Sequence, residues 1–228
     1  MLAALYDIHA NLPALEAVLA DAEQTGADRF LLGGDYASLG AWPNETLTRL
    51  RELSNAKWIR GNWERWVAGI PDVPQDDFVQ HAIRWCRDQL AEDTIAELAA
   101  LPEQVVIDGA RYCHGSPAGD MRSFAPVATD SDDELLAGVA EQRVVFGHTH
   151  VQFRRVTASG VELVNPGSVG LPFDGDVRAA YALVSDAGDV ELRRVAYDHG
   201  ASAAAVRERL AGWAASLARE LEAARFDP

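Results

Sequence analysis

The 228-residue chain is long enough to bury one hydrophobic core, and we expect a single domain over residues 1–228. Its formal net charge of −15 would repel long nucleic acids and anionic membranes over most of the surface, although bound metal ions could still attract a phosphate group locally. The two cysteines have no pair spacing, which argues against a disulfide-stabilised secreted domain. The sequence has no apolar run long enough to span a membrane and no basic leader, so we expect a cytoplasmic location.

The first 60 residues alternate between strands and helices. Apolar, β-prone runs predict strands at 2–6, 29–33 and 56–60, and helical periodicity predicts helices at 12–23 and 43–53. Asn11 suits the N-cap of the first helix, and Pro13 suits its first turn. This β-α-β-α-β order predicts an α/β fold built on parallel strands.

The middle of the chain departs from this alternation. Residues 71–101 are helical in pattern, and we interpret them as a small helical insertion laid against or over the fold. Strands are predicted at 104–108 and 111–114, on either side of the Asp108-Gly109 turn. The segment 117–133 is polar and rich in proline, glycine and serine, which predicts a long surface loop.

The last third of the chain is richer in strands and ends in a helical pattern. Strands are predicted at 143–146, 151–157, 161–164, 179–184 and 190–195. Residues 201–224 predict one amphipathic helix, whose apolar face carries Val206, Leu210, Trp213, Leu217 and Leu221. That face either packs against the domain or binds a partner, and a homo-oligomer stays open.

A series of potential metal ligands runs through most of the chain, and nearly all of its members follow a predicted strand. The members are Asp7, His9, Asp35, Asn62, His114, His148 and His150. In Asp7-x-His9 and His148-x-His150, a strand-like backbone would place both side chains on one face. Oxygen and imidazole ligands together suit Mn, Fe, Zn or similar divalent ions. Two ions about 3.5–4 Å apart, with a solvent hydroxide between them, would perform in-line phosphoester hydrolysis.

The order of these motifs resembles one known family. The motifs are Asp7-x-His9-x-Asn11, Gly34-Asp35, Gly61-Asn62-Trp63-Glu64, His114 and Gly147-His-Thr-His150, which is the order of the calcineurin-like metallophosphoesterase superfamily. More closely, the sequence resembles the small bacterial phosphodiesterases of the YfcE type and their diadenosine-tetraphosphatase-like relatives, over roughly residues 1–197. The resemblance implies a four-layer α/β/β/α sandwich with its site on loops at one end of two sheets.

The resemblance also implies two groups of ligands, each holding one ion. The first group is Asp7, His9 and His150, and the second is Asn62, His114 and His148, which would position substrate and nucleophile through the ion. Asp35 would bridge both ions. We therefore expect two divalent ions per chain, with manganese favoured and iron, nickel or zinc as alternatives.

Two asparagines lie outside this ligand set. By the same resemblance, Asn11 would support the first motif from behind its ligands. Asn165 begins Asn165-Pro-Gly-Ser-Val-Gly170, which either shapes the rim of the site or forms a structural loop.

Trp63 departs from the pattern of the family. The third motif usually carries a histidine here, which can protonate the leaving group. An indole N–H is only a donor and does not titrate, so Trp63 cannot be a general acid. It either packs in the core or forms a stacking wall for an aromatic group.

Two histidines remain as candidate acids. His81 lies in the helical insertion, where it either leans over the site or occupies an ordinary exposed helix position. His199 lies in Tyr197-Asp-His-Gly200, which predicts a surface turn.

The expected function is divalent-metal-dependent hydrolysis of a phosphodiester on a small or nucleotide-like substrate. A phosphomonoesterase or protein phosphatase would share the same metal site. A third alternative is a non-catalytic scaffold that keeps the fold, as one retromer subunit does, but such a scaffold would be expected to lose ligands. The expected partner is a small phosphoester, with no long nucleic acid and no membrane.

Overall fold

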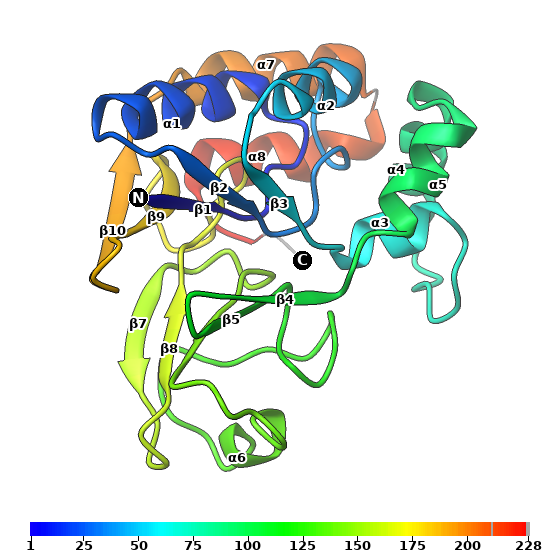
Figure 1. Ribbon diagram of the computed structural model, residues 1–228. Helices are drawn as coiled ribbons and strands as arrows, with labels where there is room; N and C mark the ends of the chain where they lie inside the picture. Colours follow the sequence, from blue (N-terminus) through cyan, green and yellow to red (C-terminus); the bar gives the residue numbers. More distant parts are fainter. Residues whose placement is uncertain (211, 227–228) are drawn as a thin grey trace.

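The computed structural model describes residues 1–210 and 212–226, and two stacked β-sheets form its centre (Figure 1). The strands of the first sheet are β1 (Leu2–Leu5), β2 (Arg29–Leu32), β3 (Ala56–Trp58), β9 (Ala179–Val184) and β10 (Val190–Val195). Those of the second sheet are β4 (Gln104–Ile107), β5 (Ala110–Cys113), β6 (Arg143–Val145), β7 (Phe153–Val156) and β8 (Glu162–Asn165). Each predicted strand is therefore present, and its bounds differ from the prediction by at most two residues.

The central strands of both sheets are parallel. The orders are β10-β9-β1-β2-β3 and β4-β5-β6-β8-β7. β1 pairs in parallel with β2 and β2 with β3, while β5 pairs in parallel with β6 and β6 with β8. The pairs β1–β9, β9–β10, β4–β5 and β7–β8 are antiparallel. The predicted α/β class is confirmed, and the carboxyl ends of the parallel strands are the expected place for a site.

β1 is buried on both faces, which explains its unbroken apolar sequence. Leu2 and Ala4 belong to the hydrophobic cluster between the two sheets, together with Tyr6 just beyond the strand. Ala3 and Leu5 belong to the cluster between the first sheet and its helices. This alternation is the two-residue period of a strand with an apolar layer on each side.

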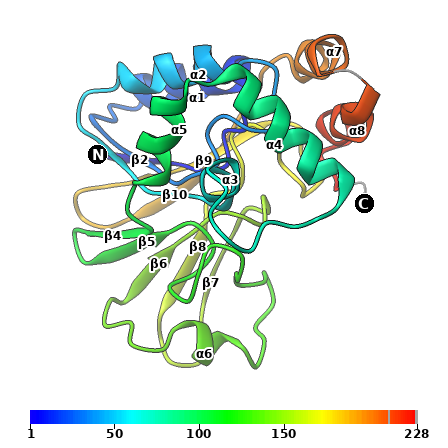
Figure 2. The same ribbon diagram turned by 90° about the vertical axis from the view of Figure 1, so that its right-hand side faces the viewer.

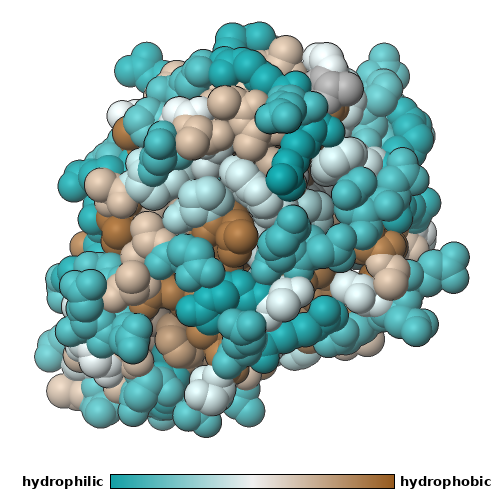
Figure 3. All heavy atoms as spheres, turned by 90° about the horizontal axis from the view of Figure 1, so that it is seen from above, coloured by the Kyte–Doolittle hydropathy of each residue, from teal (hydrophilic) through white to brown (hydrophobic). Residues whose placement is uncertain are grey.

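Helices α1 (Leu12–Gln24), α2 (Pro43–Arg51) and α7 (His199–Arg209) cover the outer face of the first sheet (Figure 1). The Asn11 side chain accepts a hydrogen bond from Ala14 N–H, so the predicted N-cap of α1 is confirmed. Seen from above, this face is mainly hydrophilic, and hydrophobic atoms show only in separate patches (Figure 3). Within the described ranges, no helix is long and apolar enough to cross a bilayer.

The layer outside the second sheet is thin. It consists of the single-turn helix α6 (Asp132–Leu135) and of irregular chain from 115 to 131. Phe124 and Leu135 pack there against Phe146 and Leu163 of the sheet side. The sandwich of two sheets flanked by helices is as expected, but its fourth layer is mostly loop.

The predicted insertion forms two helices beside the sheets (Figure 2). They are α4 (Asp77–Gln89) and α5 (Glu92–Ala99). The short helix α3 (Asn62–Val67), which the sequence did not predict, lies beneath them and carries part of the ligand series. The insertion thus packs onto the element that follows β3.

The prediction of one helix over 201–224 is wrong. α7 ends at Arg209, a 3-10 turn follows at Gly212–Ala214, and α8 (Ala215–Ala223) packs back beside α7. Leu210 and Leu217 are both buried, so the apolar spacing continues across the break and hides it. Residue 211 lies outside the described residues. Folding back buries the apolar face within the chain itself.

Candidate metal centre

The potential ligands meet at the carboxyl ends of the parallel strands. Asp7 and His9 follow β1, Asp35 follows β2, Asn62 follows β3, His114 follows β5, and His148 and His150 follow β6. All are buried except His148, which is partly exposed. The parallel topology therefore brings all seven predicted residues together, and His148 is the most exposed of them.

The backbone at these positions is not a strand, so the prediction of a shared strand face is wrong. Five of the seven potential ligands have a left-handed φ, namely Asp7 (53°), His9 (49°), Asp35 (58°), His148 (67°) and His150 (57°). Such conformations cost roughly 1–3 kcal/mol per non-glycine residue and collect at functional sites. The side chains converge because sharp turns after each strand aim them inward.

Asp7 lies between three imidazoles. Its Oδ1 is 3.4 Å from His150 Nε2, 3.9 Å from His114 Nε2 and 4.0 Å from His9 Nε2. His9 Nε2 and His150 Nε2 are 3.0 Å apart. Burial alone would raise the pKa of Asp7, but the imidazoles, His150 foremost, hold it well below its usual range. One carboxylate and two ring nitrogens therefore face one point.

A second group surrounds Asn62. Its Oδ1 lies 2.9 Å from His114 Nε2 and 3.1 Å from His148 Nδ1. Asp35 Oδ2 lies 3.3 Å from His114 Nε2 and 3.9 Å from His9 Nε2. Asp35 is thus placed between the two groups, where a bridging ligand is expected.

In both Asp7 and Asp35, one carboxylate oxygen accepts a backbone hydrogen bond and the other points into the cluster. The backbone N–H of His148 donates to Asp7 Oδ2 at 2.9 Å, and the backbone N–H of Trp63 donates to Asp35 Oδ1 at 3.0 Å. The inward atoms, Asp7 Oδ1 and Asp35 Oδ2, face the imidazoles instead. Asp7 Oδ1 is buried and has no hydrogen-bond partner within the described residues.

In their neutral forms, two of the histidines would direct a lone pair into the cluster. His114 Nδ1–H donates to the Gly33 carbonyl at 2.9 Å, and His150 Nδ1–H donates to the Leu171 carbonyl at 2.5 Å. Nε2 of each ring is then the atom that faces the carboxylates. Buried acceptors that face one another need a proton or a cation between them, because an unpaired buried polar atom is costly. The donor set fits divalent metal ions.

Charge within the cluster moves its pKa values in opposite directions. Burial alone would lower the pKa of His114, but the adjacent Asp35 carboxylate raises it to about 10. Burial alone would raise the pKa of Asp35, but His114 lowers it. Burial and repulsion from neighbouring imidazoles lower the pKa of His9 and His148 to about 4. At neutral pH and without metal, His114 is therefore protonated on Nε2, the atom that faces Asn62 and Asp35.

Glu64 holds the Asp35 loop from behind, a role that the sequence analysis missed. Its carboxylate accepts the backbone N–H groups of Asp35 (2.9 Å), Tyr36 (2.9 Å) and Gly61 (2.8 Å). Burial, reinforced by Asp35, raises the pKa of Glu64 to about 7 against these three donors. The signal was present in Gly61-Asn-Trp-Glu64, because an acid three residues after an N-cap commonly binds back to it.

The segment from Asn165 to Leu171 ties the ligand loops together. Asn165 Nδ2 donates to the Gly147 carbonyl and to Thr149 Oγ1. Ser168 Oγ donates to the Asp7 carbonyl at 2.7 Å, and Gly170 N–H donates to the same oxygen at 3.0 Å. The structural alternative for this loop is therefore the one that the contacts support.

Asn11 fastens the same segment to the C-terminal helices. Its Nδ2 donates to the Gly170 carbonyl at 2.7 Å, and its Oδ1 accepts from Ser202 Oγ at 2.9 Å. Asn11 therefore lies behind the first motif and not among the atoms that face the cluster.

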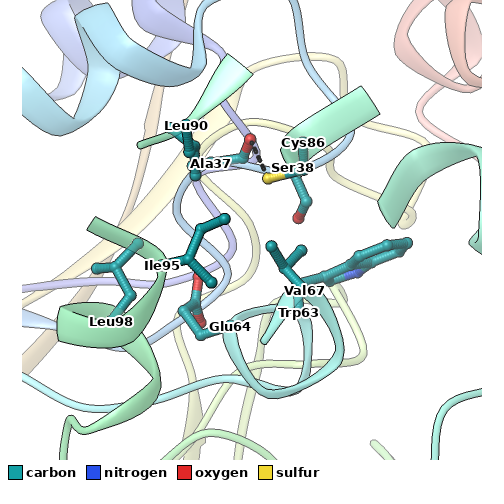
Figure 4. Close-up of a pocket in the computed structure, with 9 residues that line it drawn as sticks. All are labelled: Ala37, Ser38, Trp63, Glu64, Val67, Cys86, Leu90, Ile95 and Leu98. Atoms are coloured by element: carbon teal, nitrogen blue, oxygen red, sulfur yellow. Dashed lines mark hydrogen bonds between the residues drawn. The ribbon is translucent and has the colours of Figure 1, made fainter. Parts of the chain in front are cut away.

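Trp63 packs away from solvent. The residue is 6% exposed, and its ring meets the Trp66 ring edge-on with the centroids 5.0 Å apart. Together with Val67 and Cys86 it lines a cavity of about 10 Å³, which Figure 4 shows. Such a cavity has room for about one water molecule. The packing alternative therefore describes Trp63 better than an open stacking wall.

The structure gives the two remaining histidines other neighbours. His81 is exposed on α4, where its Nδ1 bonds the Asp77 carbonyl of the same helix and its ring stacks on Trp213. His199 begins α7 and meets the Tyr197 ring edge-on. Neither ring is among the side chains that the strand ends bring together.

The chain is similar to known proteins over most of its length. The calcineurin-like phosphoesterase superfamily domain model matches residues 1–188. An uncharacterized protein of Methanocaldococcus jannaschii is 29% identical over 236 residues, which cover 93% of this chain and 95% of that protein.

Two solved structures are similar in fold. The metallophosphoesterase from Sphaerobacter thermophilus has a TM-score of 0.82 at 27% identity, with 98% of both chains covered. The phosphoesterase Yfce from E. coli has a TM-score of 0.51 at 22% identity, covering 86% of this chain and 99% of its own. The second likeness concerns the fold alone.

Proposed function

This chain belongs to the calcineurin-like phosphoesterase superfamily, and from that membership we propose that it is a phosphodiesterase acting on small or nucleotide-like substrates. Membership supports metal-dependent hydrolysis of phosphoesters as the general activity. We further propose that each chain binds two divalent ions, with manganese favoured, and that the protein is cytoplasmic, which the two free cysteines suit.

One observation carries the metal assignment. Asp7 Oδ1 is buried, lacks a hydrogen-bond partner within the described residues, and faces His150 Nε2 at 3.4 Å. A cation at this point would satisfy all three inward atoms of Asp7, His9 and His150. A backbone N–H fixes one oxygen of each carboxylate, Asp7 and Asp35, so the other oxygen is oriented to bind the cation.

The residues divide into two ligand groups around Asp35. Asp7, His9 and His150 would hold one ion, and Asn62, His114 and His148 would hold the other. Asp35 Oδ2 lies 3.9 Å from His9 Nε2 and 3.3 Å from His114 Nε2, which supports a bridging role. Two divalent ions held here would polarise the phosphoryl oxygens and supply a water of lowered pKa as nucleophile.

The protein itself would orient and shield the reacting groups. The Gly33 and Leu171 carbonyls fix the tautomers of His114 and His150, so that Nε2 of each ring stays available. Burial of Asp7 and Asp35 excludes water from the back of the cluster. Substrate would therefore approach from the side of the partly exposed His148.

The two arginines that flank the third motif in the sequence support a diester over a monoester. Arg60 donates to the Ala99 carbonyl and pairs with Glu103. Arg65 pairs with Asp120 and donates to the Pro71 carbonyl. Both guanidinium groups are thus engaged elsewhere. A diester carries one negative charge and a monoester carries two, so the diester is the easier substrate for a chain of net charge −15.

The leaving group would depart without a histidine acid. Trp63 occupies the position of the usual histidine, its ring is buried, and an indole has no proton to give near neutral pH. General acid catalysis typically contributes about 10²–10⁴-fold. We therefore assign the chain a preference for esters with good leaving groups, such as nitrophenyl diesters, over simple alkyl esters.

The test compares two nitrophenyl substrates on protein that has been stripped of metal and reloaded with manganese. We expect kcat/KM for bis(p-nitrophenyl) phosphate to exceed that for p-nitrophenyl phosphate by at least about tenfold, one decade being roughly 1.4 kcal/mol. His150→Ala should abolish most of the activity, and the exposed His81→Ala is the matched control.

Other results would favour the alternatives. A reversed substrate ratio would identify a phosphomonoesterase on the same site. Failure of the reloaded protein to bind any divalent metal would favour a non-catalytic scaffold.

A further inference from the structure

The end of the described chain brings an exposed aromatic ring close to the metal cluster. The Phe173 ring stacks on the His150 ring, with centroids 4.5 Å apart and 19° between the planes. The Phe226 ring meets Phe173 edge-on at 5.5 Å and 63°. Phe226 is 65% exposed. Two ring contacts thus connect a solvent-facing phenylalanine to a proposed metal ligand.

Backbone contacts hold this arrangement in place. Phe173 N–H donates to the His150 carbonyl at 3.1 Å, and Gly175 N–H donates to the Ala224 carbonyl at 2.8 Å. Ala224 is fully buried and has a φ of 49°. A left-handed alanine is strained, and it turns the chain sharply after α8 so that Phe226 reaches Phe173. The position of the exposed ring is therefore built into the fold.

Exposure of Phe226 is unusual for this molecule. The large hydrophobic side chains that are exposed within the described residues are Val106, Met121, Val127, Val156 and Phe226, and only the last is aromatic. Phe226 is two ring contacts away from the proposed metal ligand His150. Base and phosphate of a nucleotide are joined by a short linker, and bases stack on aromatic side chains.

Charges beside the rings do not oppose this use. Asp174, the neighbour of Phe173, pairs with Arg194 and accepts a hydrogen bond from Gln152 N–H. Its charge is therefore compensated. A nucleobase is uncharged, so it can rest on this surface although the protein as a whole is acidic.

We propose that Phe173 and Phe226 form a stacking surface for a flat aromatic substituent of the substrate, a nucleobase in the natural compound. This inference rests on the proposed function, because it names the substrate class of that same site. The phosphate would lie at the metal cluster, and the substituent that is not displaced would lie against the rings.

The test uses binding, so that it does not depend on turnover. Calorimetry on the manganese-loaded protein compares thymidine 5′-monophosphate with methyl phosphate, which share the phosphate but differ in the substituent. We expect the wild type to bind the thymidine compound at least about tenfold more tightly, since one stacked base contributes a factor of this order. Phe226→Ala should reduce that preference about fivefold to tenfold, and Phe226→Trp should preserve it.

Two controls separate the possible outcomes. Val156→Ala removes an exposed apolar side chain of β7 and should leave the preference unchanged. Phenyl phosphate distinguishes a general aromatic surface, which binds it like the thymidine compound, from one that needs the nucleoside. Equal preferences in wild type and Phe226→Ala would overturn the proposal. A preserved effect of Phe226 on binding without any diester hydrolysis would instead refute the proposed activity and leave the stacking surface standing.

Discussion

His9 and His150, which are 141 positions apart in the sequence, place their Nε2 atoms 3.0 Å from each other in the buried cluster. The Nδ1–H of His150 is engaged by the Leu171 carbonyl, so its Nε2 carries a lone pair that points at the other ring. Two imidazole nitrogens and the unpaired Asp7 Oδ1 then surround one small volume. That relationship is the strongest structural reason to infer a bound cation.

Loss of one histidine should remove one ion and spare the other. His150→Ala deletes a ligand of the first group, while Asp35, Asn62, His114 and His148 keep the second. We expect metal content by mass spectrometry to fall from two ions per chain towards one, and diester hydrolysis to fall by at least about 100-fold, the upper range found for loss of outer-shell partners. His81→Ala should retain both ions, and an unchanged metal content in His150→Ala would contradict the assignment.

Metal binding should release about one proton near pH 8. The pKa of His114 is raised to about 10 by Asp35, so this ring is protonated in the metal-free protein, whereas His9 and His148, with pKa values of about 4, are already neutral. A metal ligand must be deprotonated, and affinity should therefore rise with pH up to about 10. Calorimetry in buffers of different ionisation enthalpy measures the proton count, and a buffer-independent heat would disagree with it.

The same shift predicts the pH dependence of the metal-free protein. The folded pKa of His114 lies above its usual value, so the stability that its charged form contributes is complete below about pH 6.5 and is lost as pH rises through about 10. Thermal unfolding in the presence of a chelator should show a decline between these limits. His114→Gln should flatten that decline, and an identical slope in the variant would mean that another group causes it.

Glu64→Gln should weaken both the fold and the metal site. The amide would aim its NH2 group at backbone donors of Asp35, Tyr36 or Gly61 that the carboxylate now accepts. We expect about 2 kcal/mol of lost stability, because a buried donor is left unsatisfied, and about 10–100-fold weaker metal binding. Denaturant unfolding and metal titration measure these effects. Glu97→Gln, at an exposed position, is the control that should change neither.

Gly61→Ala should displace the bridging carboxylate. A Cβ on Gly61 would lie 2.2 Å from Asp35 Oδ1, well inside contact distance. The aspartate must then move, so we expect metal affinity to fall by at least about tenfold, as for a disturbed ligand shell. Gly212→Ala is the matched control, because a Cβ there meets nothing within 4 Å. Unchanged metal affinity in Gly61→Ala would show that the position of Asp35 is not critical.

Trp63 should prove to be a packing residue. Its buried ring contacts Trp66 and lines the small cavity beside α4 and α5. Trp63→Ala should cost about 3–5 kcal/mol of unfolding free energy, whereas Trp63→Phe should cost less and keep the rate on nitrophenyl diesters within about threefold. A large loss of rate in a stable, metal-loaded Trp63→Phe protein would show that the indole takes part in the reaction.

The positions of the ligands could be predicted because most of them follow a recognisable strand pattern in the sequence. Short, mainly apolar runs at 2–6, 29–33 and 143–146 are followed within two residues by aspartate or histidine, and parallel strands bring such ends to one edge. The geometry that aims the side chains could not be predicted. The left-handed backbone of Asp7 and His148 depends on contacts with distant loops, including those of Ser168 and Asn165.

The break between α7 and α8 and the role of Glu64 were also not predicted from the sequence. Val206, Leu210, Leu217 and Leu221 keep a helical spacing across a break, so periodicity alone extended one helix where the chain folds back. Gly212 was the available signal for the break. Glu64 was part of a quoted motif, but its three backbone partners are visible only once the loop after β2 lies against α3.

Anomalous diffraction from crystals soaked in manganese tests the central claim most directly. We predict two peaks about 3.5–4 Å apart, the first beside Asp7, His9 and His150, the second beside Asn62, His114 and His148, with Asp35 between them. No peak in this cluster, or a single ion bound elsewhere on the protein, would contradict it.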